Sequence, residues 1–230
     1  ARGRGLPIHA ETCPQYLFLS AEDLGIDPDD PMHGARCICS PPPRDKGNQQ
    51  FIWNGLSSGL FTIFSSDHAP FNMQGSDGKR VAGDDASFDR IPNGIPGVET
   101  RLPLLMSEGV MAGRIDIHRF VELTATNPAR LYGLYPKKGT IAVGGDADFV
   151  VWDVFAEGNE KVIANDMLHH AADYTPYEGM KLRAWPGVTV SRGRVVWQDG
   201  VFSAAAGSGQ FQPCLRPRAP NATNPLDKWL

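Results

Sequence analysis

Short apolar runs alternate with amphipathic and polar stretches in the first part of the chain. Residues 60–65 form a continuous apolar run of strand length, which is typical of a parallel strand covered on both faces. Residues 8–19 predict a second strand that ends in a loop, because residues 16–19 favour β structure. Residues 36–40 predict a short buried strand, and the three prolines that follow would end it.

Helices are predicted between these runs and after them. Asn48 can cap a helix that Gly59 ends. Further helices are predicted at about 97–109 and 116–125, and Asp116 can cap the second of them.

The pattern changes at Gly139, beyond which β-hairpins replace the alternation of strands and helices. Residues 188–191 and 194–197 can pair across a turn at Arg192-Gly193, and Asp199-Gly200 predicts a second turn. We therefore expect two domains with a boundary near residues 136–140.

Composition narrows the class of protein. With 230 residues, 41% of them hydrophobic, and a net charge of -4, the chain can bury a core and lacks the basic excess of a nucleic-acid surface. No apolar run approaches the roughly 20 residues of a membrane helix. The first residue is not Met, and no signal-like stretch follows it, so we expect a chain that begins inside a longer sequence. Its four cysteines form no regular framework, which favours a reducing, cytoplasmic location.

Candidate chemistry begins where the apolar run at 60–65 meets Asp67 and His68. In a parallel α/β barrel, catalytic groups lie at the carboxyl ends of strands. A carboxylate there can bind a metal ion and carry a proton. The alternative is that Asp67 caps a loop or helix and His68 forms a hydrogen bond nearby.

Two further segments could bind an amide through their main chain. Ser40 ends a predicted strand, and Pro41-Pro42-Pro43 would hold its backbone groups in fixed directions. Asn93 lies in the Gly/Pro-rich segment 91–99, which leads into a predicted helix and can expose backbone amides. Taken singly, each segment is equally typical of a stiff surface turn.

Six motifs in order give these segments a common interpretation. Together they resemble the carboxy-terminal half of dihydropyrimidinases and D-hydantoinases, within the amidohydrolase superfamily, and the resemblance extends to about Phe202. The motifs are ETCPQYL at 11–17, CSPPPRDKGNQ at 39–49, FSSDHAPF at 64–71, IPNGIPGVETRLPLL at 91–105, TATNPARLYGLYPKKGTIAVGGDAD at 124–148 and HHAADYTPYEGM at 169–180.

The resemblance implies an α/β fold with a (β/α)8 TIM barrel and a small β-sandwich. We assign residues 1–138 to the carboxy-terminal part of the barrel, 139–206 to a segment of the β-sandwich and 207–230 to an extended tail. A complete barrel takes roughly 250 residues, so residues 1–138 supply only about half of its strand–helix units. Such a part should leave apolar edges exposed.

The resemblance also implies the chemistry. Relatives use two metal ions, usually zinc, to hydrolyse the cyclic amide bond of dihydropyrimidines and hydantoins to N-carbamoyl amino acids. Asp67 matches the aspartate that binds metal and transfers the proton. His68, directly after it, would help to orient Asp67 without binding the metal itself. Main-chain groups of Ser40 and Asn93 would bind a small cyclic imide or ureide. The other metal ligands have no match here, so we expect this chain alone to be inactive and the complete protein to be a homotetramer.

Two related classes remain as alternatives. The non-catalytic dihydropyrimidinase-related scaffold proteins lack the metal aspartate and carry Glu where this chain has Asn93. Sister cyclic amidases, dihydroorotase and allantoinase, share a Pro-Pro loop and an Asp-His element. The segment IPNGIPGVE fits the hydantoin and pyrimidine branch better than either.

Overall fold

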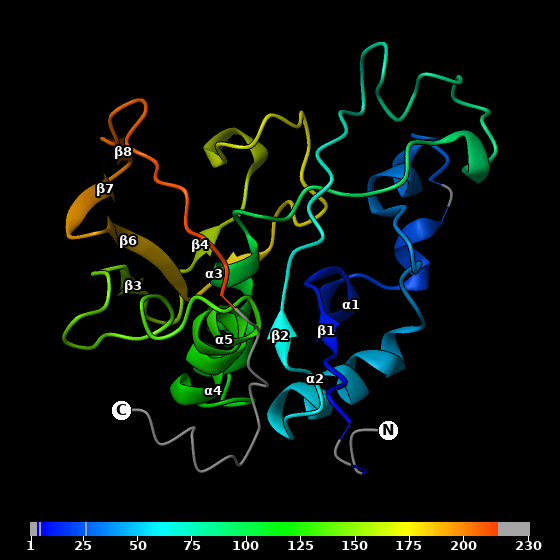
Figure 1. Cartoon of the computed structure of the whole chain (residues 1–230). Helices are drawn as coiled ribbons and strands as arrows, with labels where there is room; N and C mark the ends of the chain where they lie inside the picture. Colours follow the sequence, from blue (N-terminus) through cyan, green and yellow to red (C-terminus); the bar gives the residue numbers. More distant parts are fainter. Residues whose placement is uncertain (1–3, 5, 26, 216–230) are drawn as a thin grey trace.

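The computed structural model describes residue 4 and residues 6–25 and 27–215, and it mixes helices with three small sheets (Figure 1). The α-helices are α1 (Gln15–Phe18), α2 (Gln49–Ser57), α3 (Arg101–Leu105), α4 (Ile117–Val121) and α5 (Asn127–Leu131). The strands are β1 (Glu11–Thr12), β2 (Ile63–Phe64), β3 (Phe149–Val154), β4 (Lys161–Val162), β5 (Lys181–Leu182), β6 (Ala184–Ser191), β7 (Arg194–Gln198) and β8 (Val201–Phe202). Met106–Met111 extends α3, and Glu122–Thr126 joins α4 to α5, both as π-helical turns.

A parallel pair of strands forms the first sheet. Glu11 of β1 lies opposite Ile63 of β2, and Thr12 lies opposite Phe64. Ile63 and Phe64 are buried, as the apolar run predicts. Because the strands run in the same direction, the segments that follow both of them leave the sheet on the same side.

The largest sheet is antiparallel, with strand order β3-β6-β7-β8. Arg192 and Gly193 have φ angles of 48° and 75°, as a tight hairpin turn between β6 and β7 requires, and Asp199 and Gly200 have φ angles of 50° and 82° before β8. Both predicted turns are confirmed.

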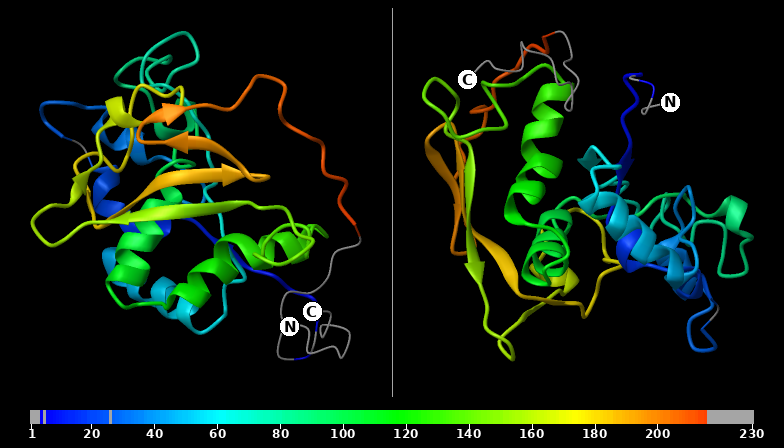
Figure 2. Two further views of the ribbon diagram at one scale, coloured as in Figure 1. Left: turned by 90° about the vertical axis from the view of Figure 1, so that its left-hand side faces the viewer. Right: turned by 90° about the horizontal axis from the view of Figure 1, so that it is seen from below.

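The helices from α3 to α5 form a column between these two sheets (Figure 2). A core of apolar residues joins the column to α1, α2, β2 and β6, and another lies beside it under the loops that follow β1 and β2. The first cluster is Leu17, Trp53, Leu56, Phe64, Leu105, Met106, Ile115, Phe120, Leu123 and Ala184, and the second is Leu19, Cys37, Cys39, Ile95, Leu104, Ile163, Tyr177, Leu182 and Trp185.

One predicted strand, 36–40, is absent, and the strand predicted at 8–19 is confirmed only at Glu11–Thr12. Residues 16–19 were expected to be extended, but Gln15–Phe18 form α1, which packs on α2 and buries Leu17. Residues 36–40 lie in a 3-10 turn, His33–Cys37, and the extended backbone that follows it. In both places tertiary burial overrides β propensity, which is a weak local preference.

The predicted helices exist, with shifted ends. Asn48 occupies the N-cap position of α2, although its side chain makes no capping bond, and Gly59 follows the helix with a φ angle of 82°. Asp116 caps α4, because its Oδ1 accepts a hydrogen bond of 2.7 Å from the Arg119 amide.

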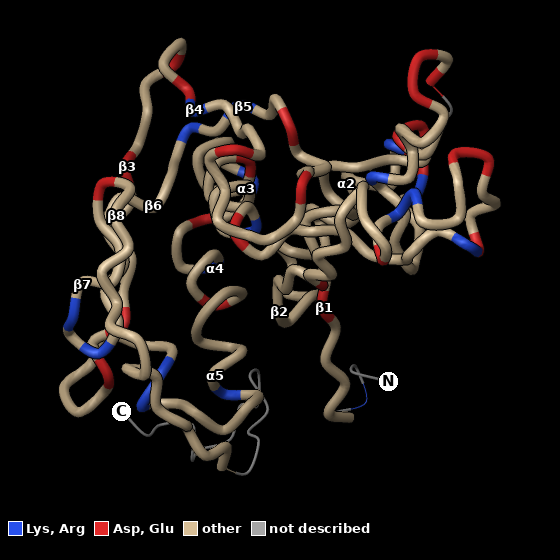
Figure 3. Tube along the Cα trace, turned by 90° about the horizontal axis from the view of Figure 1, so that it is seen from above, with Lys and Arg blue, Asp and Glu red and all other residues tan. Residues whose placement is uncertain are grey.

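The charged, thiol and exposed apolar side chains complete the description of the fold. Lys and Arg are interspersed with Asp and Glu along the trace rather than gathered into one stripe (Figure 3). Within the described residues, no helix has the length and apolar character needed to cross a bilayer. All four cysteines are free thiols, and large apolar side chains are exposed at Ile8, Phe51 and Leu60 near the parallel pair.

The predicted tail is described only as far as residue 215. Residues 207–215 run back over the end of α5, where the Leu215 amide donates to the Gly133 carbonyl over 3.2 Å. The remainder of the predicted tail, residues 216–230, lies outside the described residues.

Candidate active site

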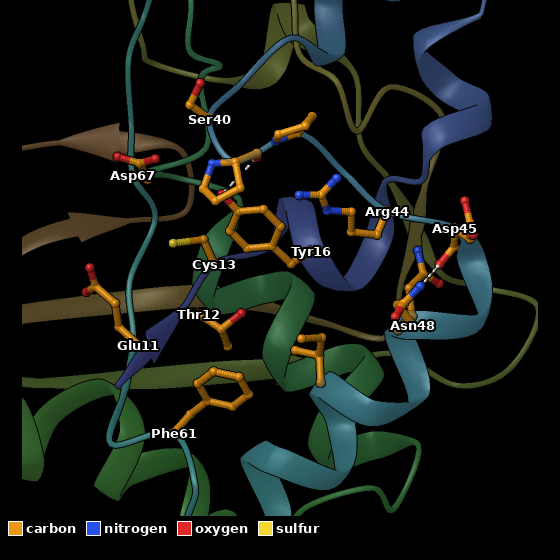
Figure 4. Close-up of a pocket in the computed structure, with 14 residues that line it drawn as sticks. Glu11, Thr12, Cys13, Tyr16, Ser40, Arg44, Asp45, Asn48, Phe61 and Asp67 are labelled. Atoms are coloured by element: carbon orange, nitrogen blue, oxygen red, sulfur yellow. Dashed lines mark hydrogen bonds between the residues drawn. The ribbon is translucent and has the colours of Figure 1, made fainter. Parts of the chain in front are cut away.

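A cavity of about 440 Å³ opens beside the carboxyl ends of β1 and β2. Its lining comes from three segments: residues 11–16, residues 40–52, and the strand that leads through Phe61 to Asp67. Ser40 and Asp67 lie near one end of the cavity, and Glu11 and Phe61 lie near the other (Figure 4). The cavity therefore has the strand-end position at which parallel α/β folds carry catalytic groups.

Asp67 stands at the rim of this cavity, with its side chain exposed. The strand before it is held at two points: the Ser65 amide donates to the Thr12 carbonyl over 3.0 Å, and the Arg101 guanidinium donates to the Phe64 carbonyl. The φ angle of Asp67 is 47°, in the left-handed region that most side chains avoid. Such conformations concentrate at functional sites, because the surrounding fold has to enforce them.

His68 faces away from the cavity, toward the start of the helix column. Its Nδ1 accepts hydrogen bonds from the Gly97 amide at 3.0 Å and the Val98 amide at 3.3 Å. Burial lowers the pKa of His68, which favours the neutral ring that can accept at Nδ1. Its ring also lies edge-on to the His170 ring, with centroids 6.4 Å apart. The side chain thus ties the Asp67 segment to the segment that leads into α3.

Ser40 and Asn93, which are 53 positions apart, meet directly. The Asn93 side-chain amide donates to the Ser40 hydroxyl over 2.6 Å. Next to this contact, the Gly94 amide donates to the Ile38 carbonyl over 3.0 Å. Ser40 lines the cavity, and Asn93 contacts it through this hydrogen bond.

The Asn93 segment also packs against the segment that follows Asp67. The Ala69 amide donates to the Ile95 carbonyl over 2.9 Å, and His68 and Ile95 form a parallel β-bridge. Gly94 has a φ angle of 133°, and a Cβ placed on it would lie 2.4 Å from the Ala69 Cβ. The structure therefore brings Asp67, Ser40 and Asn93 to one place, and this approach requires glycine at position 94.

Cys13 and Tyr16 also line the cavity, although the sequence indicated them only as part of the ETCPQYL motif. The Tyr16 hydroxyl donates to the Pro41 carbonyl over 3.2 Å, and the Cys13 Sγ lies 3.1 Å from the Ser65 Oγ. Burial raises the pKa of Cys13 to about 11 and that of Tyr16 to about 12. Both groups are therefore protonated at neutral pH, and they offer donors rather than an anionic nucleophile. Only the residue types of the ETCPQYL segment could have indicated this wall.

The side chains around this cavity do not form a metal centre by themselves. In the part of the chain that the structure describes, no three His, Cys, Asp or Glu side chains gather as potential ligands. Asp67 and Glu11 are separate carboxylates on the cavity wall. A binuclear site would need ligands from outside these residues.

The sequence matches the model of the amidohydrolase family over residues 41–196, and the chain belongs to that family. Among its relatives, the D-hydantoinase of Rhizobium radiobacter is 44% identical over 212 residues, which are 92% of this chain and 44% of that protein. The chain thus spans less than half the length of this relative.

Solved structures give the same picture. The D-hydantoinase from a Bacillus sp. AR9 superposes with a TM-score of 0.86 and 39% identity, over 94% of this chain and 46% of that one. The dihydropyrimidinase from Brevibacillus agri NCHU1002 superposes with a TM-score of 0.85 and 40% identity, over 94% and 45%. The family and these structures imply a fold of TIM-barrel type.

Proposed function

We propose that this chain is the carboxy-terminal part of a hydantoinase-type hydrolase, which opens a cyclic amide bond in dihydropyrimidines or hydantoins to yield N-carbamoyl amino acids. The observation that carries the proposal is the meeting of Asp67, Ser40 and Asn93 beside one cavity at the carboxyl ends of parallel strands. The high identity to D-hydantoinases over 92% of the chain supports it.

Asp67 is the proposed acid and base. Its carboxylate takes a proton from the attacking water and returns it to the leaving ring nitrogen, so that one side chain serves both halves of the reaction. We propose that Asp67 is also one ligand of a metal pair, zinc in the simplest case, whose other ligands lie outside this chain. Bound metal ions would polarise the amide carbonyl and lower the pKa of the water.

Ser40 and Asn93 are the proposed substrate-binding residues. The hydrogen bond between their side chains leaves main-chain donors and acceptors of both segments available to an imide ring. His68 stabilises this arrangement, because its Nδ1 accepts hydrogen bonds from the amides of residues 97 and 98 and so connects them to the Asp67 segment.

The same proposal covers the architecture. Residues 1–138 would form the last strand–helix units of a barrel, residues 139–206 a segment of a β-sandwich, and residues 207–230 a tail. The complete enzyme would be a cytoplasmic homotetramer, and the chain alone would be inactive. The exposed apolar side chains near the parallel pair are consistent with strands that are completed elsewhere.

A fusion enzyme tests the proposal. This chain is joined behind the amino-terminal half of the Rhizobium radiobacter D-hydantoinase, and ring opening of hydantoin, dihydrouracil, dihydroorotate and allantoin is followed. We expect turnover of hydantoin or dihydrouracil that a metal chelator abolishes, and no turnover by this chain alone.

The substrate profile separates the alternatives. Preference for dihydroorotate or allantoin would assign a sister amidase. A folded, metal-loaded fusion that opens none of the four rings would favour the non-catalytic scaffold class and refute the proposal.

A further inference from the structure

Lys79 is a fully buried lysine in a polar loop. The loop spans residues 68–96 and carries many Gly and Asp residues, yet Lys79 is 0% exposed. Within the described residues it has no carboxylate partner, and the thiols of Cys37 and Cys39 are the ionisable groups that face it. Burying an ammonium group without a counter-charge is costly, so its contacts have to compensate.

The contacts of its amine are two backbone carbonyls beside the candidate site. Nζ lies 2.9 Å from the Pro92 carbonyl oxygen and 3.4 Å from that of Ile38. Pro92 directly precedes Asn93, and Ile38 lies two residues before Ser40. One side chain thus joins the two segments that carry the proposed substrate-binding residues.

Two other hydrogen bonds join the same segments. The Gly94 amide donates to the Ile38 carbonyl, and the Asn93 side chain donates to the Ser40 hydroxyl. Of the three connections, that of Lys79 comes from a fully buried side chain. The Ser40–Asn93 bond lies at the exposed surface, where water competes with it.

The backbone around Lys79 is itself held in place. The Lys79 amide donates to the Asn72 carbonyl over 2.8 Å, and the Asp173 carboxylate accepts from the Met73 amide over 2.6 Å and the Gln74 amide over 3.1 Å. These hydrogen bonds fix the backbone from which the Lys79 side chain extends.

We propose that Lys79 is a positioning residue of this site: its buried amine sets the spacing between the Ser40 and Asn93 segments at which they bind a cyclic ureide. The inference rests on the function proposed above. Because Lys79 has no place on the cavity wall, it acts through the segments and not on the substrate. Its loss should weaken substrate binding more than it slows the chemical step.

The first test uses the fusion enzyme with Lys79→Met, which keeps the length of the side chain but removes its donors. We expect KM for hydantoin or dihydrouracil to rise roughly ten-fold while kcat falls less than three-fold. Lys79→Gln, which keeps an N–H donor, should give a smaller rise. Lys181→Met is the matched control, since Lys181 is exposed on β5 and lies outside the lining of the cavity, and it should leave both constants unchanged.

The second test uses the 230-residue chain itself and needs no activity. Hydrogen exchange measured by NMR should be at least ten-fold faster at the Gly94 amide in Lys79→Met than in the native chain, with Lys181→Met unchanged. If Lys79→Met does not fold, Lys79→Gln decides both measurements.

The outcomes are distinguishable. An inactive native fusion defeats the proposed function but leaves the exchange measurement to decide whether Lys79 joins the segments. An active fusion in which the Lys79 variants keep the native KM, or a chain in which Gly94 keeps its protection, overturns the positioning role.

Discussion

The two sheets of this molecule hold their strands in opposite ways. In the antiparallel sheet, strands of up to eight residues pair along their length, and two-residue turns join β6 to β7 and β7 to β8. In the parallel pair, each strand has two residues. Side chains from distant parts of the chain donate hydrogen bonds to the backbone carbonyls in and before β2. Asn127 donates to the Thr62 carbonyl over 2.9 Å, and Arg119 donates to the carbonyls of Leu56 and Phe61 over 2.7 Å and 2.6 Å.

This difference shows how a short strand can still position a candidate catalytic group. Main-chain pairing over two residues fixes little, so buried polar side chains supply the missing connections. Each of them is costly to remove, because the carbonyl that it satisfies would remain buried. We therefore expect single polar substitutions to damage the parallel region more than turn substitutions damage the antiparallel sheet.

The largest effect should fall on Asp67. In the fusion enzyme, Asp67→Asn removes the proton carrier and should lower kcat for ring opening by roughly 10²- to 10⁴-fold. Asp77→Asn, at an exposed position in the following loop, is the control and should have no effect. Turnover of Asp67→Asn within a few-fold of native would exclude the acid–base role.

Lys79 should make stability depend on pH. Burial lowers the pKa of Lys79 from 10.5 to about 8, so between these values the unfolded chain binds more protons than the folded one. Stability should therefore rise with pH from about 8 toward 10, by at most about 3 kcal/mol.

Burial raises the pKa of Cys37 and Cys39 above the ordinary thiol value of 9.0, which makes stability fall with pH above that value and opposes the trend from Lys79. The difference between native and Lys79→Met urea denaturation isolates the lysine. A difference that stays constant from pH 7 to 10 would contradict the assignment.

Asn127→Leu tests the support of β2. The substitution leaves the fully buried Thr62 carbonyl without its side-chain donor and should destabilise the chain by about 1–3 kcal/mol. Urea denaturation measures the loss, with Asn159→Leu at an exposed turn as the control. Equal stabilities of the two variants would mean that β2 does not depend on this bond.

The smallest effect is expected in the antiparallel sheet. Gly200→Ala puts a side chain at a φ angle of 82°, where the added Cβ meets no neighbouring atom, so only backbone strain of about 1 kcal/mol should follow. Gly47→Ala also has open space but no positive φ and should be close to neutral. A loss larger than that of Asn127→Leu would reverse the proposed ranking of the two regions.

Sequence patterns predicted the antiparallel region better than the parallel one, for a physical reason. The turns at Arg192-Gly193 and Asp199-Gly200 depend on local backbone preferences, and both are present. The segment at 16–19 has a β-favouring composition, yet it is helical because Leu17 packs into the core between α1 and α2. Local backbone preferences thus predict the positions of the turns, whereas burial decides whether the segments between turns are helices or strands.

The candidate site divides in the same way. Asp67, Ser40 and Asn93 could be selected from motifs, because each stands next to a strand end or a Gly/Pro-rich turn. Lys79 could not, since a lysine among Gly and Asp residues gives no local indication of burial. Its role depends on carbonyls 13 and 41 residues away, which only the folded chain brings together.

Gly94 gives the site a geometric rule. Because a Cβ at position 94 would lie 2.4 Å from the Ala69 Cβ, the segments that carry Asp67 and Asn93 approach as closely as a glycine allows. A methyl group added at Gly94 would push the two segments apart without changing any charge. The spacing of these two segments is thus set by the smallest side chains between them, and not by the carboxylate or the amide that they carry.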